Sequence, residues 1–483
     1  MKAVGPSPAS RHRSASTPSS WPNQPPRVDG CTSAQAGRRN ENQITPLRTP
    51  VGYSRTQQHN RYRQADAAPS CTTIPALMLL PHPLLRVSDL RRSTSRPNLR
   101  QLIRQHGVHE FYNARAAIYQ LARFLRGQGR STILLPSFHC PSVVEPVLRA
   151  GMRPAFYRID RNLELDASDV ASRLSGDVAA VLFINYLGWP SSFDSLLDDL
   201  RSREILAVED CAHAAIQSDP LDLAGRRGDA AIYSFWKFVP SGVGGGLWLA
   251  DNVPFVAPRL TGVPVRDSLT RGKQLLEEVI QSRGEHTRAA RAWSWFEERR
   301  VRVQTWLHPQ RRQTHRQTCP SDAADLSPDE ARQYFFSERL AQSRLPRTAE
   351  RIIACADLPS LTSARRQNYQ TLGSILRHNG SILPVHSELP ANISPHAFAV
   401  MLADRSRHDR RLRTTGVPVW TFGSTLHRVL RETADAAVIS DARYLSETML
   451  LIPVHQLLTM ADMTRFGNIL NRYAAKEMPC KSN

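Results

Sequence analysis

Short apolar runs and amphipathic stretches alternate along the chain between about residues 108 and 250. The apolar runs lack the polar–apolar alternation of a half-exposed strand, and the stretches between them carry apolar residues at helical spacing. Strands are predicted at 132–135, 154–157, 179–185, 205–209, 230–235 and 245–249, and helices at 114–125, 141–150 and 193–201. Apolar strands separated by helices indicate a mostly parallel sheet covered on both faces. The pattern therefore predicts an α/β fold with helices flanking a central sheet.

The pattern changes in the last third of the chain. Helices are predicted at 364–378, 441–449 and 460–473, and extended segments at 398–402 and 450–454. This mixture predicts a smaller C-terminal α+β domain. The domain boundaries expected from these changes are a lead-in at 78–107, a large domain at 108–260, a helical arginine-rich insertion or linker at 261–350, a small domain at 351–475 and a tail at 476–483.

Residues 1–77 are rich in Ser, Pro, Arg, Gln and Asn and show no apolar periodicity. Such a segment is expected to be disordered, because it has too little apolar surface to bury. Two interpretations compete: an arginine-rich targeting segment or nucleic-acid arm, and an upstream extension that is not translated. The second is favoured, with Met78 as the first residue, because folded-looking sequence begins shortly after that methionine.

The positive charge is concentrated in two segments. The chain of 483 residues has a formal net charge of +20, and residues 1–100 and 281–320 supply 17 of these excess charges. The remainder is close to neutral, which is typical of a metabolic enzyme and not of a nucleic-acid-binding protein. Only five of the 63 basic residues are lysines, and Lys237 alone lies inside an apolar α/β stretch. A buried lysine can lose its charge and act as a nucleophile, which an arginine cannot.

Cysteine content and hydropathy narrow the class of protein further. The seven cysteines form no C-x-x-C pair and have no regular spacing, so free thiols in a reducing compartment are expected and a metal site is not. No run of 18 apolar residues exists, so no membrane span is expected. Together these features predict a cytoplasmic protein.

Polar and reactive side chains follow two neighbouring strands of the predicted sheet. Asp210 ends one strand, and His213 comes three residues later. Ser234 and Lys237 follow the next strand, with glycines at 242 and 244–246 after them. Ligands of open α/β folds bind at the carboxyl ends of the strands. Each signal alone has an ordinary structural explanation, but their combination and order point to a common site.

Catalysis with pyridoxal 5′-phosphate (PLP) requires four kinds of protein group. These are a lysine amine for the aldehyde, a carboxylate for the pyridine nitrogen, backbone N–H groups for the phosphate, and a flat or apolar partner for the ring. Lys237 and Asp210 meet the first two requirements. The predicted helix opening with Asn113-Ala114-Arg115 meets the third. We therefore expect PLP as the cofactor.

The stretch from about 110 to 250 resembles the DegT-type aminotransferases, PLP enzymes best known for aminating keto-sugar nucleotides. The similarity lies in "NARAAIYQLARFL", "ILLPSFHCPSVVEPVLRAGMRPAFYRID", "VLFINYLGWPSSFD", "VEDCAHA" and "GDAAIYSFWKFVPSGVGGGLWL". A weaker similarity continues through "ARRQNY", "TTGVPVW" and "LLIPVHQLLTMADMTRF". The first hundred residues and most of 265–345 lie outside it.

The resemblance implies a fold-type-I PLP-dependent transferase that acts as a homodimer. It also implies roles by matching position. Lys237 would bind the coenzyme as an imine and move the proton, and Asp210 would pair with the pyridinium. His213 would contact the ring hydroxyl, and Phe138 would stack on the ring. The phosphate would be bound by backbone N–H groups of Ala114 and Arg115 and by the hydroxyl of Ser234.

Three features depart from the common family pattern. The lysine lies three residues after Ser234, in an S-x-x-K-x-x-P arrangement like that of one divergent branch, where the common pattern has five. Arg115 stands where threonine is usual. The strict match to the ring-stacking aromatic is Cys140, and either Phe138 or His139 is expected to take that role. These departures affect the substrate more than the cofactor.

The expected function is amino transfer from an amino-acid donor such as glutamate to a carbonyl acceptor. By analogy with the family, the expected acceptor is a keto-sugar nucleotide. A dehydratase or lyase of the same fold is the first alternative, and retention of Lys237 favours transamination over it. A non-catalytic nucleic-acid-binding relative is the second. The arginine-rich segment 281–320, with Trp293, Trp295 and Trp306, motivates it. A solvated helical insertion is the preferred interpretation of that segment, and nucleic acid is not an expected partner.

Overall fold

In the computed structural model of this chain, the described residues are 82–91, 98–219, 222–282, 336–376 and 382–477, with scattered positions between 288 and 299. The predicted disordered extension at 1–77, most of the tail after 476, and Trp306 with most of the arginine-rich segment lie outside the described residues. None of the helices within the described part is long and apolar enough to cross a membrane.

A seven-stranded sheet forms the centre of the fold. Its order is β1-β7-β6-β5-β4-β2-β3. The strands are β1 (His109–Phe111), β2 (Thr132–Pro136), β3 (Arg153–Tyr157), β4 (Val178–Ile184), β5 (Leu206–Cys211), β6 (Ala230–Ser234) and β7 (Gly245–Leu249). Strands β3, β2, β4, β5 and β6 are parallel, and β7 runs antiparallel to both of its neighbours. The predicted mostly parallel sheet is confirmed, and every residue of β2, β4 and β6 is buried.

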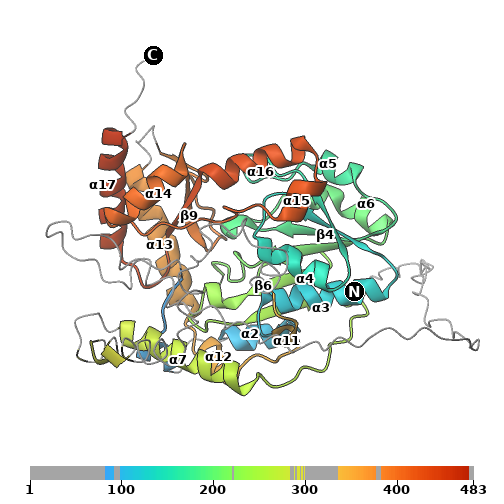
Figure 1. Ribbon diagram of the computed structural model, residues 1–483, viewed down its shortest axis with the longest axis horizontal. Helices are drawn as coiled ribbons and strands as arrows, with labels where there is room; N and C mark the ends of the chain where they lie inside the picture. Colours follow the sequence, from blue (N-terminus) through green and yellow to red (C-terminus); the bar gives the residue numbers. More distant parts are fainter. Residues whose placement is uncertain are drawn as a thin grey trace, which may run out of the picture. The chain divides into compact units, whose positions relative to one another are not determined.

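Helices follow the strands as the hydrophobic pattern predicts. Helix α3 (Ala114–Gly127) begins at Asn113, whose side chain accepts a hydrogen bond from the Ala116 N–H. Its apolar face packs on β6 and β7, and it lies beside α4 (Val144–Arg149), as Figure 1 shows. The other helices before and within this region are α2 (Leu99–Gln105), α5 (Ala167–Ser172), α6 (Leu197–Ser202) and α7 (Val265–Ser282).

The C-terminal part contains a second sheet, antiparallel and three-stranded, in the order β10-β9-β8. Its strands are β8 (Leu383–Pro384), β9 (Ala397–Met401) and β10 (Met449–Pro453). The helices of this part are α11 (Glu338–Ala341), α12 (Arg347–Ala354), α13 (Leu358–Leu376), α14 (Arg405–Thr414), α15 (Arg428–Thr433), α16 (Ala436–Thr448) and α17 (Met460–Glu477). Helices α13 and α17 lie side by side next to β9 (Figure 1). The predicted α+β character of the C-terminal part is therefore confirmed.

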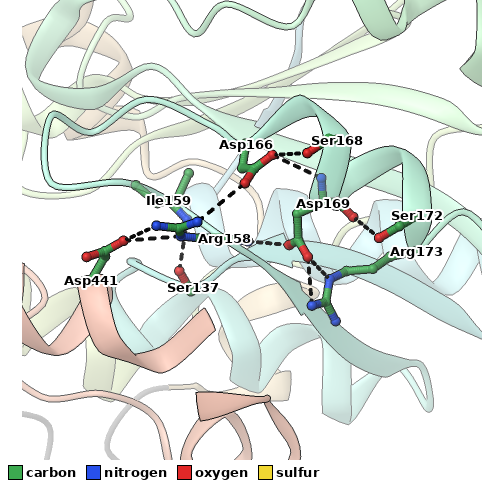
Figure 2. A network of polar contacts seen from close by, with 9 residues as sticks. All are labelled: Ser137, Arg158, Ile159, Asp166, Ser168, Asp169, Ser172, Arg173 and Asp441. Atoms are coloured by element: carbon green, nitrogen blue, oxygen red, sulfur yellow. Dashed lines mark hydrogen bonds and ion pairs between the residues drawn. The ribbon is translucent and has the colours of Figure 1, made fainter. Parts of the chain in front are cut away.

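Arg158, just after β3, joins the central sheet to α16. Its guanidinium donates hydrogen bonds to Asp441 Oδ2 from Nε at 3.2 Å and from Nη2 at 2.9 Å, and its backbone N–H donates to Asp169. The neighbouring Ile159 N–H donates to Ser137, which precedes Phe138 (Figure 2). The network thus connects the loop after β2, by way of Ile159 and Arg158, with α16, whose Asp441 is 283 residues beyond Arg158.

Candidate active site

Lys237 lies in a single turn of 3₁₀ helix, Phe235–Lys237, that directly follows β6. Its side chain is largely enclosed by the protein. Burial lowers the pKa of its amine, although the nearby Asp210 and Cys140 raise it. Because burial outweighs these attractions, the amine is easier to deprotonate than a lysine in water. A neutral amine is the form that attacks a carbonyl group.

Asp210 is the penultimate residue of β5, the strand next to β6. Its side chain is buried, and its Oδ1 accepts a hydrogen bond from the Ala212 N–H at 2.9 Å. Burial raises the pKa of this carboxyl, while the Ala212 hydrogen bond and the charge of Lys237 lower it. Strands β5 and β6 are parallel, so both side chains arise at the carboxyl edge of the sheet and interact electrostatically there.

His213 is buried in the turn after β5. Among the described residues, no hydrogen-bond partner reaches its Nδ1. Its ring stacks on His396 with centroids 4.7 Å apart and meets Phe422 edge-on at 4.8 Å. Burial and the charge of Lys237 hold the pKa of His213 well below its usual value. The imidazole is therefore neutral and has an unused nitrogen.

The N-terminus of α3 borders the same site. Ala114 and Arg115 are the first two residues of α3, and the N–H groups of a first helical turn point outward along the helix axis, where an anion can bind them. Arg115 is close enough to Lys237 for its charge to lower the lysine pKa. The β7 strand comes very near this turn, because a Cβ on Gly245 would lie 2.1 Å from the backbone carbon of Asn113. Only glycine allows this approach.

Ser234 ends β6 and pairs in the sheet with Gly245. It is buried, and it lies at the junction between β6 and the 3₁₀ turn that carries Lys237. Sheet pairing therefore brings the predicted serine to the same edge as the lysine and the helix N-terminus.

The loop after β2 holds the three candidates for the ring-stacking residue. His139 packs into the core, where its ring stacks on Phe156 at 5.4 Å and its Nδ1 lies 2.7 Å from the Pro136 carbonyl. Phe138 is fully buried against Phe422, 5.4 Å away edge-to-face. Cys140 is partly exposed, and it lies close enough to Lys237 to influence the pKa of the lysine. Of the three, the thiol of Cys140 borders the lysine, and the role of Phe138 stays a prediction.

Two further side chains at the site escaped the sequence analysis. His396, just before β9, stacks on His213. Arg365 of α13 is fully buried and donates hydrogen bonds to the Lys237 carbonyl at 3.1 Å and to the carbonyl of His396 at 3.3 Å. Both belong to the C-terminal part, and their packing against the lysine turn follows from tertiary structure. Within the quoted resemblance, "ARRQNY" contains Arg365 but gives no sign of this role.

The arginine-rich segment is described only at scattered positions. Arg299 lies over the Trp295 ring at 4.3 Å, and Trp293 lies 6.0 Å from Phe296. Trp293 and Trp295 therefore make contacts with other residues of the same segment. The expectation that nucleic acid is not a partner stays a prediction.

Comparison with known proteins finds a family match in the first part of the described chain. Residues 100–252 match the DegT/DnrJ/EryC1/StrS aminotransferase family. The dTDP-4-dehydro-2,3,6-trideoxy-D-glucose 4-aminotransferase of Saccharopolyspora spinosa is 30% identical over 139 residues, which are 28% of this chain and 36% of that protein. This and the other curated relatives are matched over about a third of their own length.

Solved structures extend the likeness in fold to more of the chain. The sugar aminotransferase CalS13 from Micromonospora echinospora has a TM-score of 0.54 at 16% identity, covering 82% of this chain and 100% of that chain. The GDP-4-keto-6-deoxymannose-3-dehydratase ColD has a TM-score of 0.51 at 16% identity, covering 77% and 90%. At these identities the likeness concerns the fold alone. The chain therefore shares the fold of these proteins, and its residues 100–252 are similar to the DegT/DnrJ/EryC1/StrS aminotransferase family.

Proposed function

We propose that this chain is a PLP-dependent aminotransferase that moves an amino group from an amino acid, such as glutamate, to the carbonyl group of a sugar nucleotide. One observation carries the proposal. The amine of Lys237, whose pKa is lowered by burial, lies near enough to the Asp210 carboxyl and to Arg115 at the N-terminus of α3 to interact electrostatically with both, at the carboxyl edge of the sheet. This arrangement is the one that PLP requires.

The residues present fit the coenzyme. The unpaired Nδ1 of His213 is a hydrogen-bond partner for a ring hydroxyl. The close approach of Gly245 to Asn113 keeps side chains away from the first turn of α3, where two N–H groups suit a phosphate. Cys140 offers a small, polarizable side chain at the position where family members carry an aromatic ring.

When bound, PLP supplies an electron sink for the carbanion that forms at the substrate α-carbon. The protein's own residues do the remaining work. Asp210 would hold the pyridine nitrogen by its carboxylate, and His213, being neutral, would hydrogen-bond without adding charge. The Lys237 amine would take the proton from the α-carbon of the donor in the first half of the reaction, and it would deliver a proton to the carbon that accepts the amino group in the second half.

The proposal is tested by the visible absorption of the purified protein with added PLP. Wild type should show a band that borohydride abolishes, leaving a pyridoxyl group that mass spectrometry maps to Lys237. Lys237→Ala should lose the band and about 10²- to 10⁴-fold or more of the activity. Lys273→Ala is the matched control, because Lys273 pairs with Glu277 on α7. A colourless wild type, or an adduct on Lys273, would overturn the proposal.

A dehydratase is the second candidate, because ColD shares the fold. The two reactions differ in what happens to the donor nitrogen. An aminotransferase incubated with PLP, glutamate and a sugar nucleotide leaves the donor nitrogen in the sugar product as an amino group. Release of ammonia from a sugar nucleotide, with no amino group retained in the product, would favour the dehydratase.

The proposal includes a homodimer, as the family resemblance implies. Light scattering on the purified protein should give twice the chain mass of 54.2 kDa. A monomer that still binds PLP would contradict the homodimer and leave the proposed PLP chemistry standing.

A further inference from the structure

His396 lies near Lys237 but has no role in the proposed reaction. It belongs to the C-terminal part, yet its ring stacks on His213 with centroids 4.7 Å apart and an interplanar angle of 11°. His82 also stacks on the His396 ring, with centroids 5.6 Å apart. His396 also lies close enough to Lys237 for the charge of that lysine to lower the histidine pKa. The ring therefore lies inside the candidate site.

The backbone of His396 is held from both sides. Its N–H donates to the Leu187 carbonyl at 2.8 Å, and its carbonyl accepts from Arg365 at 3.3 Å. The same guanidinium binds the carbonyl of Lys237, so one buried side chain fixes the positions of both residues. Gly188 allows the close contact, since a Cβ there would lie 2.9 Å from the Ser394 carbonyl oxygen. Such fixed placement is typical of residues that orient a ligand.

The Nδ1 of His396 is buried and has no hydrogen-bond partner among the described residues. An unsatisfied buried nitrogen destabilises the folded chain, and a bound ligand that supplies the missing partner removes this cost. The neighbouring His213 has an unsatisfied Nδ1 as well. Two adjacent rings with unused nitrogens, both beside Lys237, indicate a ligand with more than one polar group.

We propose that His396 contacts the ligand bound beside Asp210 and Lys237, and that its Nδ1 hydrogen-bonds an oxygen of that ligand. The inference rests on the proposed function. The oxygen belongs either to the coenzyme or to the amino-acid donor, and the experiment distinguishes them.

The contact is made by a neutral ring. Burial chiefly, with Coulombic interactions with His213, Lys237, His82 and Arg365, holds the pKa of His396 well below its usual value. Its hydrogen bond is therefore insensitive to pH in the region around 6.5, where an ordinary histidine takes up a proton.

The test compares His396→Phe and His396→Gln with wild type and with His386→Gln. His386 is the matched control, because its ring also stacks on an aromatic side chain, Trp189 at 4.2 Å, but has no coupling to Lys237. PLP is titrated by visible absorbance, and glutamate is then titrated into each PLP-loaded protein. One lost hydrogen bond should weaken one of these two binding steps by about tenfold in both His396 variants, which is about 1.4 kcal/mol. The affected step identifies whether coenzyme or donor supplies the oxygen.

Thermal unfolding without PLP gives a second, independent measurement. His396→Phe keeps the stacking and removes the unsatisfied nitrogen, so its melting temperature should equal or exceed that of wild type. A lower melting temperature would show that the imidazole serves the fold, and unchanged titrations in both variants would show that it touches no ligand. Either result overturns the inference while the wild-type band preserves the proposed function. Absence of that band in wild type would instead remove the proposed function.

Discussion

The burial of Lys237 disfavours the charged form of its amine. Its folded-state pKa lies below the unfolded value of about 10.4, so the unfolded chain binds more protons between the two values. Stability therefore rises with pH through that window, and below it the buried amine costs folding free energy. This cost is a property expected of catalytic residues, which are selected for reactivity.

Replacing Lys237 by Met should stabilise the coenzyme-free protein at pH 7. The gain survives the lost attraction to Asp210, because burial is the larger influence on the lysine pKa. Each unit of pKa shift corresponds to about 1.4 kcal/mol. Urea unfolding at pH 7 and pH 10 should show a gain at pH 7 that shrinks at pH 10. Lys273→Met should show no gain, since that lysine pairs with Glu277. A destabilised Lys237→Met at pH 7 would contradict the burial argument.

Of the individual residues at the site, those at strand ends could be predicted from the sequence. Lys237, Ser234 and Asp210 follow strands or end them, and parallel pairing brings such positions together. His396 and Arg365 could not be found in this way. They come from the C-terminal part, and their approach to Lys237 depends on how α13 and the segment before β9 pack, which no local pattern encodes.

At the scale of elements, the contact between β7 and the start of α3 shapes the predicted phosphate site. Gly245→Ala would place a Cβ 2.1 Å from backbone, which cannot move as a flexible side chain can. We expect a loss of about 1–3 kcal/mol in the free energy of unfolding, together with weaker PLP binding, because the first turn of α3 must shift. Denaturant titration and the PLP absorbance titration measure the two effects.

Gly272→Ala is the control for that substitution. Gly272 lies within α7, and a Cβ there meets no atom within 4 Å. Alanine should stabilise this helix by up to about 1 kcal/mol and leave PLP binding unchanged. Equal losses in the two variants would show that the β7–α3 contact has no special importance.

Most elements of the central sheet region could be predicted from the apolar pattern, but strand β1 and helix α5 could not. The predicted 114–125 helix and 132–135 strand correspond to α3 and β2 within two residues. Strand β1 has three residues and α5 has six, which are too few to show a period. Both were missed. Strand β1 matters for the site, because it leads directly into the turn before α3.

At the scale of the whole molecule, the Arg158 network ties the central sheet to the C-terminal part (Figure 2). Asp441 accepts from Arg158 and, through its other oxygen, from Arg161 at 3.0 Å. Burial raises the pKa of Asp441, but these hydrogen bonds lower it more, so its folded-state pKa lies below the ordinary value. A carboxyl of this kind stabilises the fold above its unfolded pKa, and the contribution is lost as the pH falls through the folded pKa.

Asp441→Asn should therefore lower the free energy of unfolding at pH 7 and have a smaller effect at pH 3, where the wild-type carboxyl begins to take up a proton. Asp435→Asn is the control, because Asp435 is mostly exposed and its pairing with Arg173 contributes little. The loop holding Phe138 follows Ser137, which shares this network, so Asp441→Asn should also weaken PLP binding while Asp435→Asn does not. Urea unfolding at both pH values and the PLP titration decide the matter: equal behaviour of the two variants would mean that the C-terminal part reaches the site through Arg365 and not through Arg158.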